Sequence, residues 1–184
     1  MIFALDISRS LAALHEIPIW GPVVHADIKP EQFLVVLQDF NGHDIMRAKL
    51  NDLNRCRIRQ YHALTGDPCP IVISTAKGRW RAPEEYQFDP LTEKIDIYSM
   101  GISFWSMIAR KKPFSGEKIN RNGGYDIVME GKRPEIMDSW DAEFVSVMTD
   151  CWNQNYKLRP TAREVSNRLS SLLKKLYPQY GSLE

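Results

Sequence analysis

A charged loop set between apolar runs, VVHADIKPEQFLV at residues 23–35, constrains this chain more than any other stretch. His25, Asp27 and Lys29 alternate with other residues within it, Pro30 closes the charged part, and apolar residues follow. Charged side chains on a loop that rigid segments hold in place are typical of binding and catalytic sites. The stretch is therefore a candidate catalytic loop, or the remains of one.

The spacing of apolar residues changes on either side of this loop. Residues 2–14 follow helical spacing, and Pro18 and the Gly21-Pro22 pair then stop the helix. After the loop, the runs FLVVL and IMRAKL flank an Asn41-Gly42 pair, which favours a tight hairpin turn. Four further helices are predicted at 95–110, 119–130, 139–152 and 162–176, the last opening with the capping-box residues Thr161 and Glu164.

These elements predict a mainly α fold with one small β-hairpin, formed as a single domain over residues 1–184. Residues 52–84 lie between the hairpin and the later helices and show no clean periodicity. A long irregular segment inside a compact domain is either functional or argues against the assignment of elements.

Composition excludes several classes of protein. With 43% hydrophobic residues, 26% charged residues and a net charge of +1, the chain is neither disordered nor polybasic, and no nucleic-acid contact is indicated. Three cysteines without CxxC spacing favour a reducing compartment and give no sign of a cysteine-based metal site. The N-terminus lacks the basic region of a signal peptide, and the run IYSMGISFWSMIA is too short to cross a bilayer. We expect a cytoplasmic protein without membrane contact, and its oligomeric state is left open.

Five motifs occur in the order in which eukaryotic protein kinases have them. HADIKPEQ is similar to the catalytic loop H-R-D-x-x-x-x-N, NDLN to the D-F-G site, and RAPEE contains A-P-E. DIYSMGISFWSMI resembles the helix after the activation segment, and CWNQNYKLRPT resembles the signature near the end of the kinase domain. Each motif is weak alone, but the set covers essentially the whole chain. The resemblance implies the C-terminal lobe of a kinase, and CW and KRPE resemble the tyrosine-kinase-like branch.

The resemblance implies phosphotransfer from ATP, with Mg²⁺, to a protein substrate. Asp27 would accept the proton of the substrate hydroxyl, and Lys29 would approach the transferred phosphate. Asp52 would bind Mg²⁺, together with the side-chain amide of Gln32. Leu34 would lie beneath the adenine ring, although a plain core strand residue would have the same sequence.

The same resemblance gives five residues structural roles. His25 would pack beneath Leu53 and would not act as a base. Glu84 would pair with Arg159 and so tie the end of the activation segment to the C-terminal helices. Asp96 would accept hydrogen bonds from backbone N–H groups at the turn after His25, with a simple helix N-cap as the alternative.

The chain departs from the family pattern at several positions. Ala26 stands where the family usually has Arg, which removes the usual partner of a phosphorylated activation loop. Gln32 replaces the metal-binding Asn, and a displacement of about 1 Å can cost on the order of 100-fold in rate. Asn54 replaces a Gly, and Asn tolerates a left-handed backbone well. A Thr that contacts the catalytic Asp in related kinases aligns with either Lys77 or Thr75.

No G-x-G-x-x-G loop and no strand lysine precede His25, so the N-terminal β lobe is expected to be absent and the chain inactive alone. We expect a protein kinase domain whose small lobe is encoded upstream, with Ser/Thr acceptors favoured by Lys29. A pseudokinase-like binding or scaffold module is the alternative, which Gln32 favours weakly. A third possibility is an unstable fragment that exposes apolar surface around Leu34 and Leu53.

Overall fold

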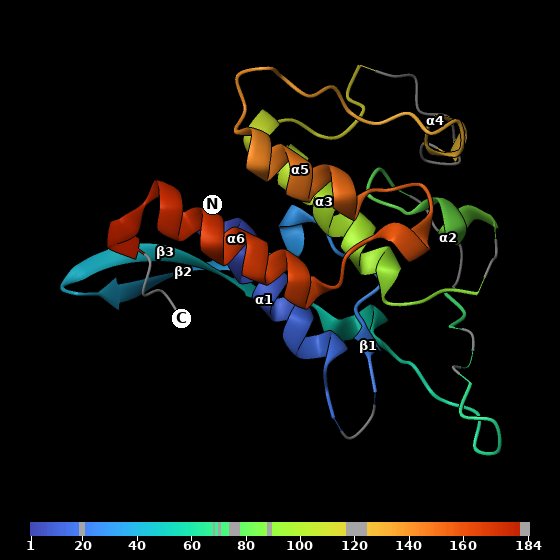
Figure 1. The fold of residues 1–184 in the computed structure, drawn as a ribbon. Helices are drawn as coiled ribbons and strands as arrows, with labels where there is room; N and C mark the ends of the chain where they lie inside the picture. The colour runs from blue at the N-terminus through green and yellow to red at the C-terminus, as the bar shows by residue number, and fades with distance from the viewer. Residues whose placement is uncertain are drawn as a thin grey trace.

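The computed structural model describes residues 1–18, 21–67, 69, 71–73, 78–87, 90–116 and 125–180. These residues form a mainly helical body with two small antiparallel sheets, in which β1 pairs with β4 and β2 with β3 (Figure 1). No described helix is long and apolar enough to cross a membrane. The elements in chain order are α1 (Ile2–His15), β1 (Val23–Val24), η1 (Pro30–Gln32), β2 (Phe33–Phe40), β3 (His43–Leu50), η2 (Leu53–Arg55), β4 (Arg57–Ile58), α2 (Pro83–Gln87), α3 (Lys94–Ala109), α4 (Tyr125–Met129), α5 (Ala142–Cys151), η3 (Tyr156–Leu158), α6 (Ala162–Leu176) and η4 (Pro178–Tyr180).

Helix α3 is the centre of the core. Its residues from Ile95 to Ser106 are all buried, and a helix that is buried all round must be covered on every side. Helices α1 and α5 and the short turns η1 and η3 contact it. Gly101 allows the close approach of α5, because a Cβ atom at this position would lie 2.8 Å from the Cβ of Cys151.

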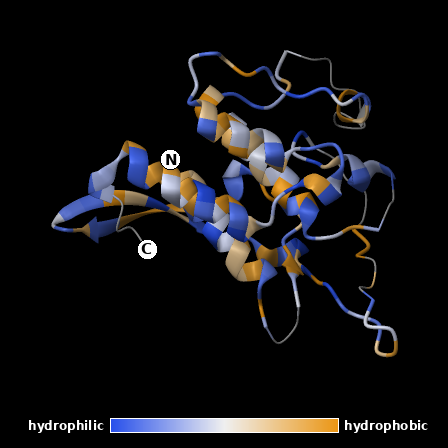
Figure 2. Ribbon diagram, in the orientation of Figure 1, coloured by the Kyte–Doolittle hydropathy of each residue, from blue (hydrophilic) through white to orange (hydrophobic). Residues whose placement is uncertain are grey.

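Helix α6 lies against α1 and closes the core on its outer side (Figure 1). Its buried face is formed by residues such as Val165, Leu169 and Leu173, and Figure 2 shows hydrophilic residues interleaved with these. At its start, the side chain of Thr161 accepts from the backbone of Glu164, and the Glu164 carboxylate accepts from the backbone of Thr161. The predicted helix and its capping box are therefore confirmed.

Strands β2 and β3 form the predicted hairpin, in which β3 lies beside α1 (Figure 1). At its tip, Asn41 and Gly42 have φ angles of 54° and 78°, and a two-residue type I′ turn requires a positive φ at both positions. Near its base, the guanidinium of Arg47 pairs with the carboxylate of Asp6 at 2.6 Å, and both side chains are buried. This pair fixes the hairpin to α1.

Two predictions concern less regular parts of the chain. The end of the helix expected at 119–130 is present as α4, Tyr125–Met129, while residues 117–124 with their Gly pair lie outside the described residues. The segment 52–84 contains η2, β4 and the start of α2, so it is not free of regular structure. Strands β1 and β4 escaped notice because each has only two residues, too few to show a period. Their pairing places the catalytic loop beside the segment that follows Asp52.

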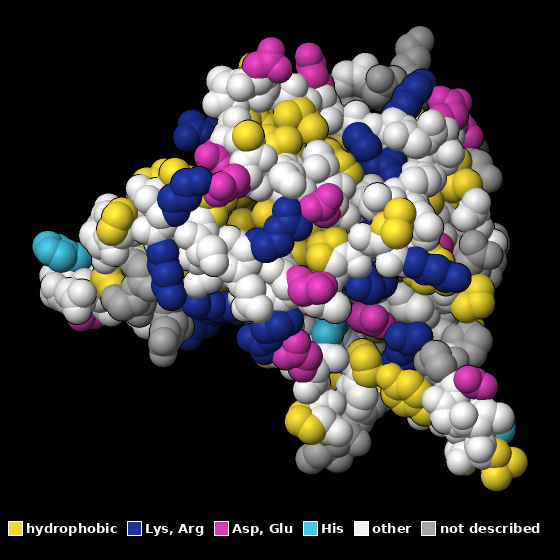
Figure 3. Space-filling view, in the orientation of Figure 1, with side chains coloured by type: hydrophobic (Ala, Val, Ile, Leu, Met, Phe, Trp, Pro, Cys, Tyr) yellow, Lys and Arg dark blue, Asp and Glu magenta, His cyan; other side chains and the backbone are white. Residues whose placement is uncertain are grey.

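The surface carries charges of both signs as well as exposed apolar side chains. Lys and Arg alternate with Asp and Glu over the face shown in Figure 3, in line with the net charge of +1. The apolar exposure expected around Leu34 and Leu53 is present, since both side chains are 55% exposed. Leu37 and Met46, a cross-strand pair on the hairpin, are also more than half exposed. The described residues leave these four side chains largely uncovered.

Candidate active site

The candidate catalytic loop is fixed to the core by Asp96, in the first turn of α3. Its Oδ2 accepts from the backbone N–H of His25 at 2.7 Å, and its Oδ1 accepts from that of Ala26 at 2.8 Å. Ala26 has a φ of 64°, an unfavourable conformation for a residue with a Cβ atom that surrounding contacts must maintain. The two hydrogen bonds implied by the resemblance are thus present. The N-cap of α3 is Glu93, so the alternative of an N-cap at Asp96 is wrong.

His15, the last residue of α1, also contacts Asp96. Its Nε2 lies 3.0 Å from Asp96 Oδ2, and its side chain is 7% exposed. The sequence pattern indicated a helix here and gave no sign of this contact, because the two residues are 81 positions apart. The carboxylate of Asp96, in α3, therefore contacts both α1 and the candidate catalytic loop.

Asp27 is held by donors on both carboxylate oxygens. Its Oδ2 accepts from the Gln32 amide at 2.7 Å and lies 3.3 Å from Lys29 Nζ, while its Oδ1 contacts the guanidinium of Arg81. Burial raises the pKa of Asp27, but the charge of Arg81, the Gln32 hydrogen bond and Lys29 together outweigh it and hold the pKa below its usual value. The carboxylate is therefore oriented and ionised near neutral pH, which is the form that can accept a proton.

Gln32 lies in η1 and is buried. Its side-chain amide bonds Asp27, and its backbone carbonyl accepts from the N–H of Asn51 at 2.9 Å. Gln32 therefore joins the loop to the residue that precedes Asp52. The amide nitrogen of Gln32 donates to Asp27, which leaves the amide oxygen as the atom that could bind a metal ion.

Asp52 is in a left-handed backbone conformation, with φ 59° and ψ 68°. The residue expected to tolerate such a conformation was Asn54, which instead lies within η2 and has no positive φ. Asp52 Oδ1 is buried and has no hydrogen-bond partner among the described residues. Buried polar atoms normally find partners, so this oxygen is suited to a cation.

The site residues fit a magnesium ion shared with a nucleotide. No group of three or more metal-binding side chains occurs among the described residues. Mg²⁺ needs no such cage, because one or two carboxylates, water and substrate phosphates commonly complete its coordination. The unpartnered oxygen of Asp52 could supply the carboxylate, and the side chain of Lys29 is 34% exposed and could reach a phosphate.

The apolar residues near the site differ in exposure. His25 is fully buried, and its Nε2 lies 3.1 Å from the backbone carbonyl of Asn51. Leu53, expected to lie over His25, begins the short turn η2 and is 55% exposed. Leu34 is equally exposed, as a residue beneath a ligand would be before the ligand binds.

Arg81 and Glu85 were not identified from the sequence, although both lie in the RAPEE motif. Arg81 Nη1 donates to the carbonyl of Ala26 at 2.6 Å and lies 3.4 Å from Glu85 Oε1. Burial raises the pKa of Glu85 to about 7, and the charge of Arg81 and the N–H of Ala82 offset only part of this effect. The i, i+4 spacing of Arg81 and Glu85 was the one available signal.

A small pocket of about 120 Å³ opens beside Asp27. The catalytic loop forms one wall with Asp27 to Lys29, and Gly78, Trp80 and Arg81 form the other. An acceptor side chain in this pocket would be adjacent to both Asp27 and Lys29. Residues 74–77, where a contacting Thr was sought at Thr75 or Lys77, lie outside the described residues.

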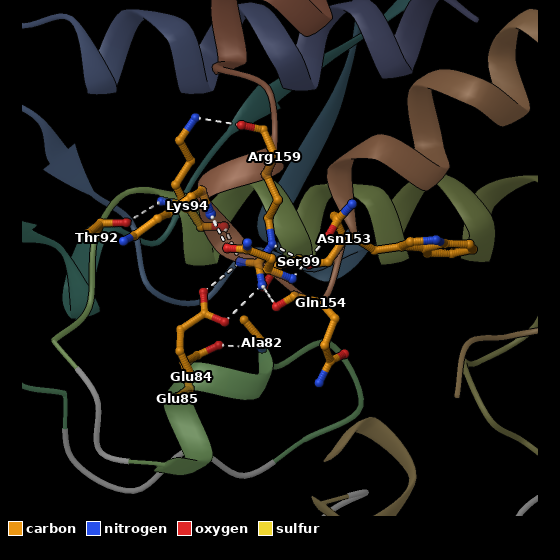
Figure 4. A network of polar contacts seen from close by, with 12 residues as sticks. Ala82, Glu84, Glu85, Thr92, Lys94, Ser99, Asn153, Gln154 and Arg159 are labelled. Atoms are coloured by element: carbon orange, nitrogen blue, oxygen red, sulfur yellow. Dashed lines mark hydrogen bonds and ion pairs between the residues drawn. The ribbon is translucent and has the colours of Figure 1, made fainter. Parts of the chain in front are cut away.

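Glu84 and Arg159 form a buried two-point ion pair (Figure 4). The two guanidinium nitrogens of Arg159 lie 2.5 and 2.8 Å from the Glu84 oxygens, and its side chain is fully buried. The guanidinium also donates to the carbonyls of Lys94 and Asn153 at 2.9 and 2.8 Å, and it lies 5.0 Å from the centre of the Tyr98 ring. The pairing implied by the resemblance is present, and it joins α2 to the segment before α6.

Comparisons with known proteins agree with this geometry. The family model described as "Protein kinase domain" matches residues 2–169. A protein of Acanthamoeba polyphaga mimivirus, named as a serine/threonine-protein kinase/receptor, is 31% identical over 82% of this chain and 8% of its own length. A dual specificity protein kinase of Dictyostelium discoideum is 30% identical over 94% of this chain and 32% of its own length. A serine/threonine-protein kinase of Arabidopsis thaliana is 24% identical, with 94% of this chain matching 27% of the relative. The chain thus spans only a small part of each relative.

Proposed function

Because the chain belongs to the protein kinase family, we propose that residues 1–184 form the large, mainly helical lobe of a kinase domain as one unit, which transfers the γ-phosphate of ATP to a Ser or Thr hydroxyl. Kinases of this family use ATP, usually with Mg²⁺, and act on proteins. The observation that carries the proposal is the Asp27 carboxylate, oriented by Gln32 and Arg81 at the edge of a pocket that also exposes Lys29.

The proposed roles come from the resemblance to the kinase motifs, and the positions of the side chains support them. Asp27 accepts the proton of the acceptor hydroxyl, and Gln32 keeps the carboxylate turned toward the pocket by donating to Oδ2. Lys29 neutralises charge on the transferred group, and the unpartnered Asp52 Oδ1 holds the metal. When bound, Mg-ATP supplies the phosphoryl group that is transferred. Gln32 is thus primarily an orienting residue, with its amide oxygen available to the metal.

A Ser or Thr acceptor is favoured over Tyr by the resemblance, in which a Lys at the position of Lys29 accompanies Ser/Thr kinases. The mimivirus and Arabidopsis relatives are named as serine/threonine kinases, while the Dictyostelium relative is named as dual specificity.

We expect phosphotransfer to require residues outside this chain. Residues 1–184 contain no Gly-rich loop and no strand lysine of the kind that cover and neutralise the nucleotide phosphates. The side chains of Leu34 and Leu53 are both 55% exposed, so apolar surface is available for such a cover. Millimolar Mg-ATP should therefore cause almost no thermal shift of the isolated chain if its Kd is millimolar or weaker, since a ligand at a concentration equal to Kd stabilises a fold by only about 0.4 kcal/mol.

A scaffold function is the second candidate, because the Gln32 amide is engaged by Asp27. The experiment measures phosphorylation of a peptide library that contains Ser, Thr and Tyr. The enzyme is the full-length polypeptide, meaning residues 1–184 together with the lobe expected upstream, and it is compared with its variants. Asp27→Ala and Asp52→Ala should abolish transfer, while the control Asp39→Ala, on the exposed hairpin, should leave it unchanged. Binding of Mg-ATP without any transfer, with Gln32→Asn unable to restore it, would refute the proposed phosphotransfer and favour the scaffold function.

A further inference from the structure

Arg81 makes two contacts with the catalytic loop from the side opposite Asp96. Its Nη1 donates to the carbonyl of Ala26 at 2.6 Å, and its Nη2 pairs with Asp27 Oδ1. The side chain is 9% exposed, so these contacts are largely shielded from water and from salt. A planar guanidinium can hold a carbonyl and a carboxylate at once with fixed geometry, which a lysine ammonium cannot do as well.

Glu85 contacts both the side chain of Arg81 and the backbone of the next residue. Its Oε1 lies 3.4 Å from Arg81 Nη1, and its Oε2 accepts from the backbone N–H of Ala82 at 2.7 Å. Because Ala82 directly follows Arg81 in the chain, Glu85 fastens both the side chain and the adjacent backbone to the first turn of α2. The orientation of the guanidinium is therefore set by α2, the same short helix whose Glu84 is tied to Arg159.

The loop has no cation of its own at the position next to the catalytic Asp. Ala26 stands there, and its backbone is held in a left-handed conformation with φ 64°. Asp96 binds the N–H groups of His25 and Ala26 on one side. The Ala26 carbonyl and the Asp27 carboxylate point the other way, and Arg81 meets both.

We propose that Arg81 is a positioning residue for the catalytic base, which holds the Ala26-Asp27 turn in its working geometry from the α2 side in place of a cation at position 26. The inference rests on the proposed role of Asp27. This role of Arg81 would couple the acceptor pocket to the catalytic loop. The segment that lines the pocket with Gly78 and Trp80 also carries Arg81, which orients Asp27. Loss of the two Arg81 contacts should loosen the loop even where the core is intact.

Hydrogen exchange of the full-length polypeptide tests this coupling without relying on activity. In Arg81→Met, backbone amides of residues 25–27 should exchange about 10-fold faster or more, because charge-assisted hydrogen bonds of this kind shift local opening by such a factor. Amides of α6 should exchange as in the unchanged protein. Arg81→Lys should give an intermediate rate, because it retains the charge and loses one of the two contacts.

Arg79→Met is the matched control. Arg79 lies two residues away and donates to two backbone carbonyls, those of Pro113 and Phe114, both at 2.8 Å. Among the described residues, these hydrogen bonds join Arg79 to the segment after α3 and not to the catalytic loop. Its replacement should leave exchange at residues 25–27 unchanged.

Two exchange results would overturn the inference. One is equal exchange at residues 25–27 in Arg81→Met and Arg79→Met. The other is an equally large rise in the exchange rate of α6 amides in Arg81→Met, which would indicate a general loss of stability.

In the kinase assay, Arg81→Met should lower kcat about 10-fold or more while KM for ATP stays unchanged, because the orientation of the base acts on the chemical step. A rise in KM for ATP alone would also contradict it. If the unchanged protein transfers no phosphate, the proposed function fails, while the exchange rates still decide whether Arg81 holds the loop.

Discussion

Replacing Arg159 with Met removes a charge from the most completely buried ion pair of the chain that the structure describes. The Arg159 side chain is fully buried, and its guanidinium meets Glu84 through two contacts of 2.5 and 2.8 Å. The hydrogen bonds to the carbonyls of Lys94 and Asn153 would also be lost. Because Met has a similar length and keeps much of the apolar packing, the dominant effect should be the stranding of the Glu84 carboxylate.

The expected cost can be set against that of an exposed pair. Removing one partner of a buried ion pair typically costs about 3–5 kcal/mol, because the remaining charge is left without compensation. Exposed pairs contribute about 0–1 kcal/mol. With a urea m-value of about 1–3 kcal/mol per molar, Arg159→Met should lower the midpoint of unfolding by about 1 M or more.

The assay is urea unfolding of residues 1–184, followed by tryptophan fluorescence. Arg163→Met is the control, because Arg163 pairs with Glu16 at 2.6 Å while its side chain is 52% exposed, and it should shift the midpoint little. Glu84→Gln combined with Arg159→Met should cost less than the sum of the two single changes, since residues in contact are not additive. Midpoints for Arg159→Met and Arg163→Met that agree within error would refute the reasoning.

Three further changes test other contacts. Asp96→Ala should lower the melting temperature, because the N–H groups of His25 and Ala26 lose their acceptor; a change in activity with unaltered melting would contradict the bracing role. Gly101→Ala should destabilise the fold by about 1–3 kcal/mol through overpacking, since the new Cβ would lie 2.8 Å from that of Cys151; unchanged thermal unfolding would count against this close packing. For Glu85, burial raises the folded-state pKa to about 7, so the folded protein binds more protons than the unfolded chain between the ordinary glutamate pKa and that value, and the contribution of Glu85 to stability falls as pH rises through about 7. The difference in unfolding free energy between the unchanged protein and Glu85→Gln should therefore decrease from pH 5 to pH 8, and a difference independent of pH would exclude the shifted pKa.

Local features of this fold were determined by the sequence itself. The capping box at Thr161 and Glu164 satisfies backbone groups within one turn, and the Asn41-Gly42 pair supplies the positive φ angles that a tight hairpin needs. The apolar run of α3 marks a buried helix without reference to any other segment. Each of these signals acts between residues that are close in the chain, so the pattern is sufficient.

The order of the motifs added pairings that no local pattern carries. The contacts between Glu84 and Arg159, and between Asp96 and the turn at His25, join positions 75 and 71 residues apart. Neither periodicity nor composition could relate these residues, and only the resemblance to a family with the same order of motifs implied that they meet. The catalytic roles proposed for Asp27 and Asp52 rest on the same resemblance.

Other features were decided only by the tertiary structure. His15 reaches Asp96, Arg81 reaches Asp27, and Asp52 takes the left-handed conformation expected of Asn54. A side chain such as Arg81 has many partners open to it in an extended chain, and its local sequence does not favour one of them. When α2 packs against the rest of the fold, the guanidinium of Arg81 comes within reach of the catalytic loop and is shielded from water. In this less polar environment the contact with Asp27 is stronger than it would be in water. The choice of partner thus depends on chain closure and burial, which are properties of the folded molecule.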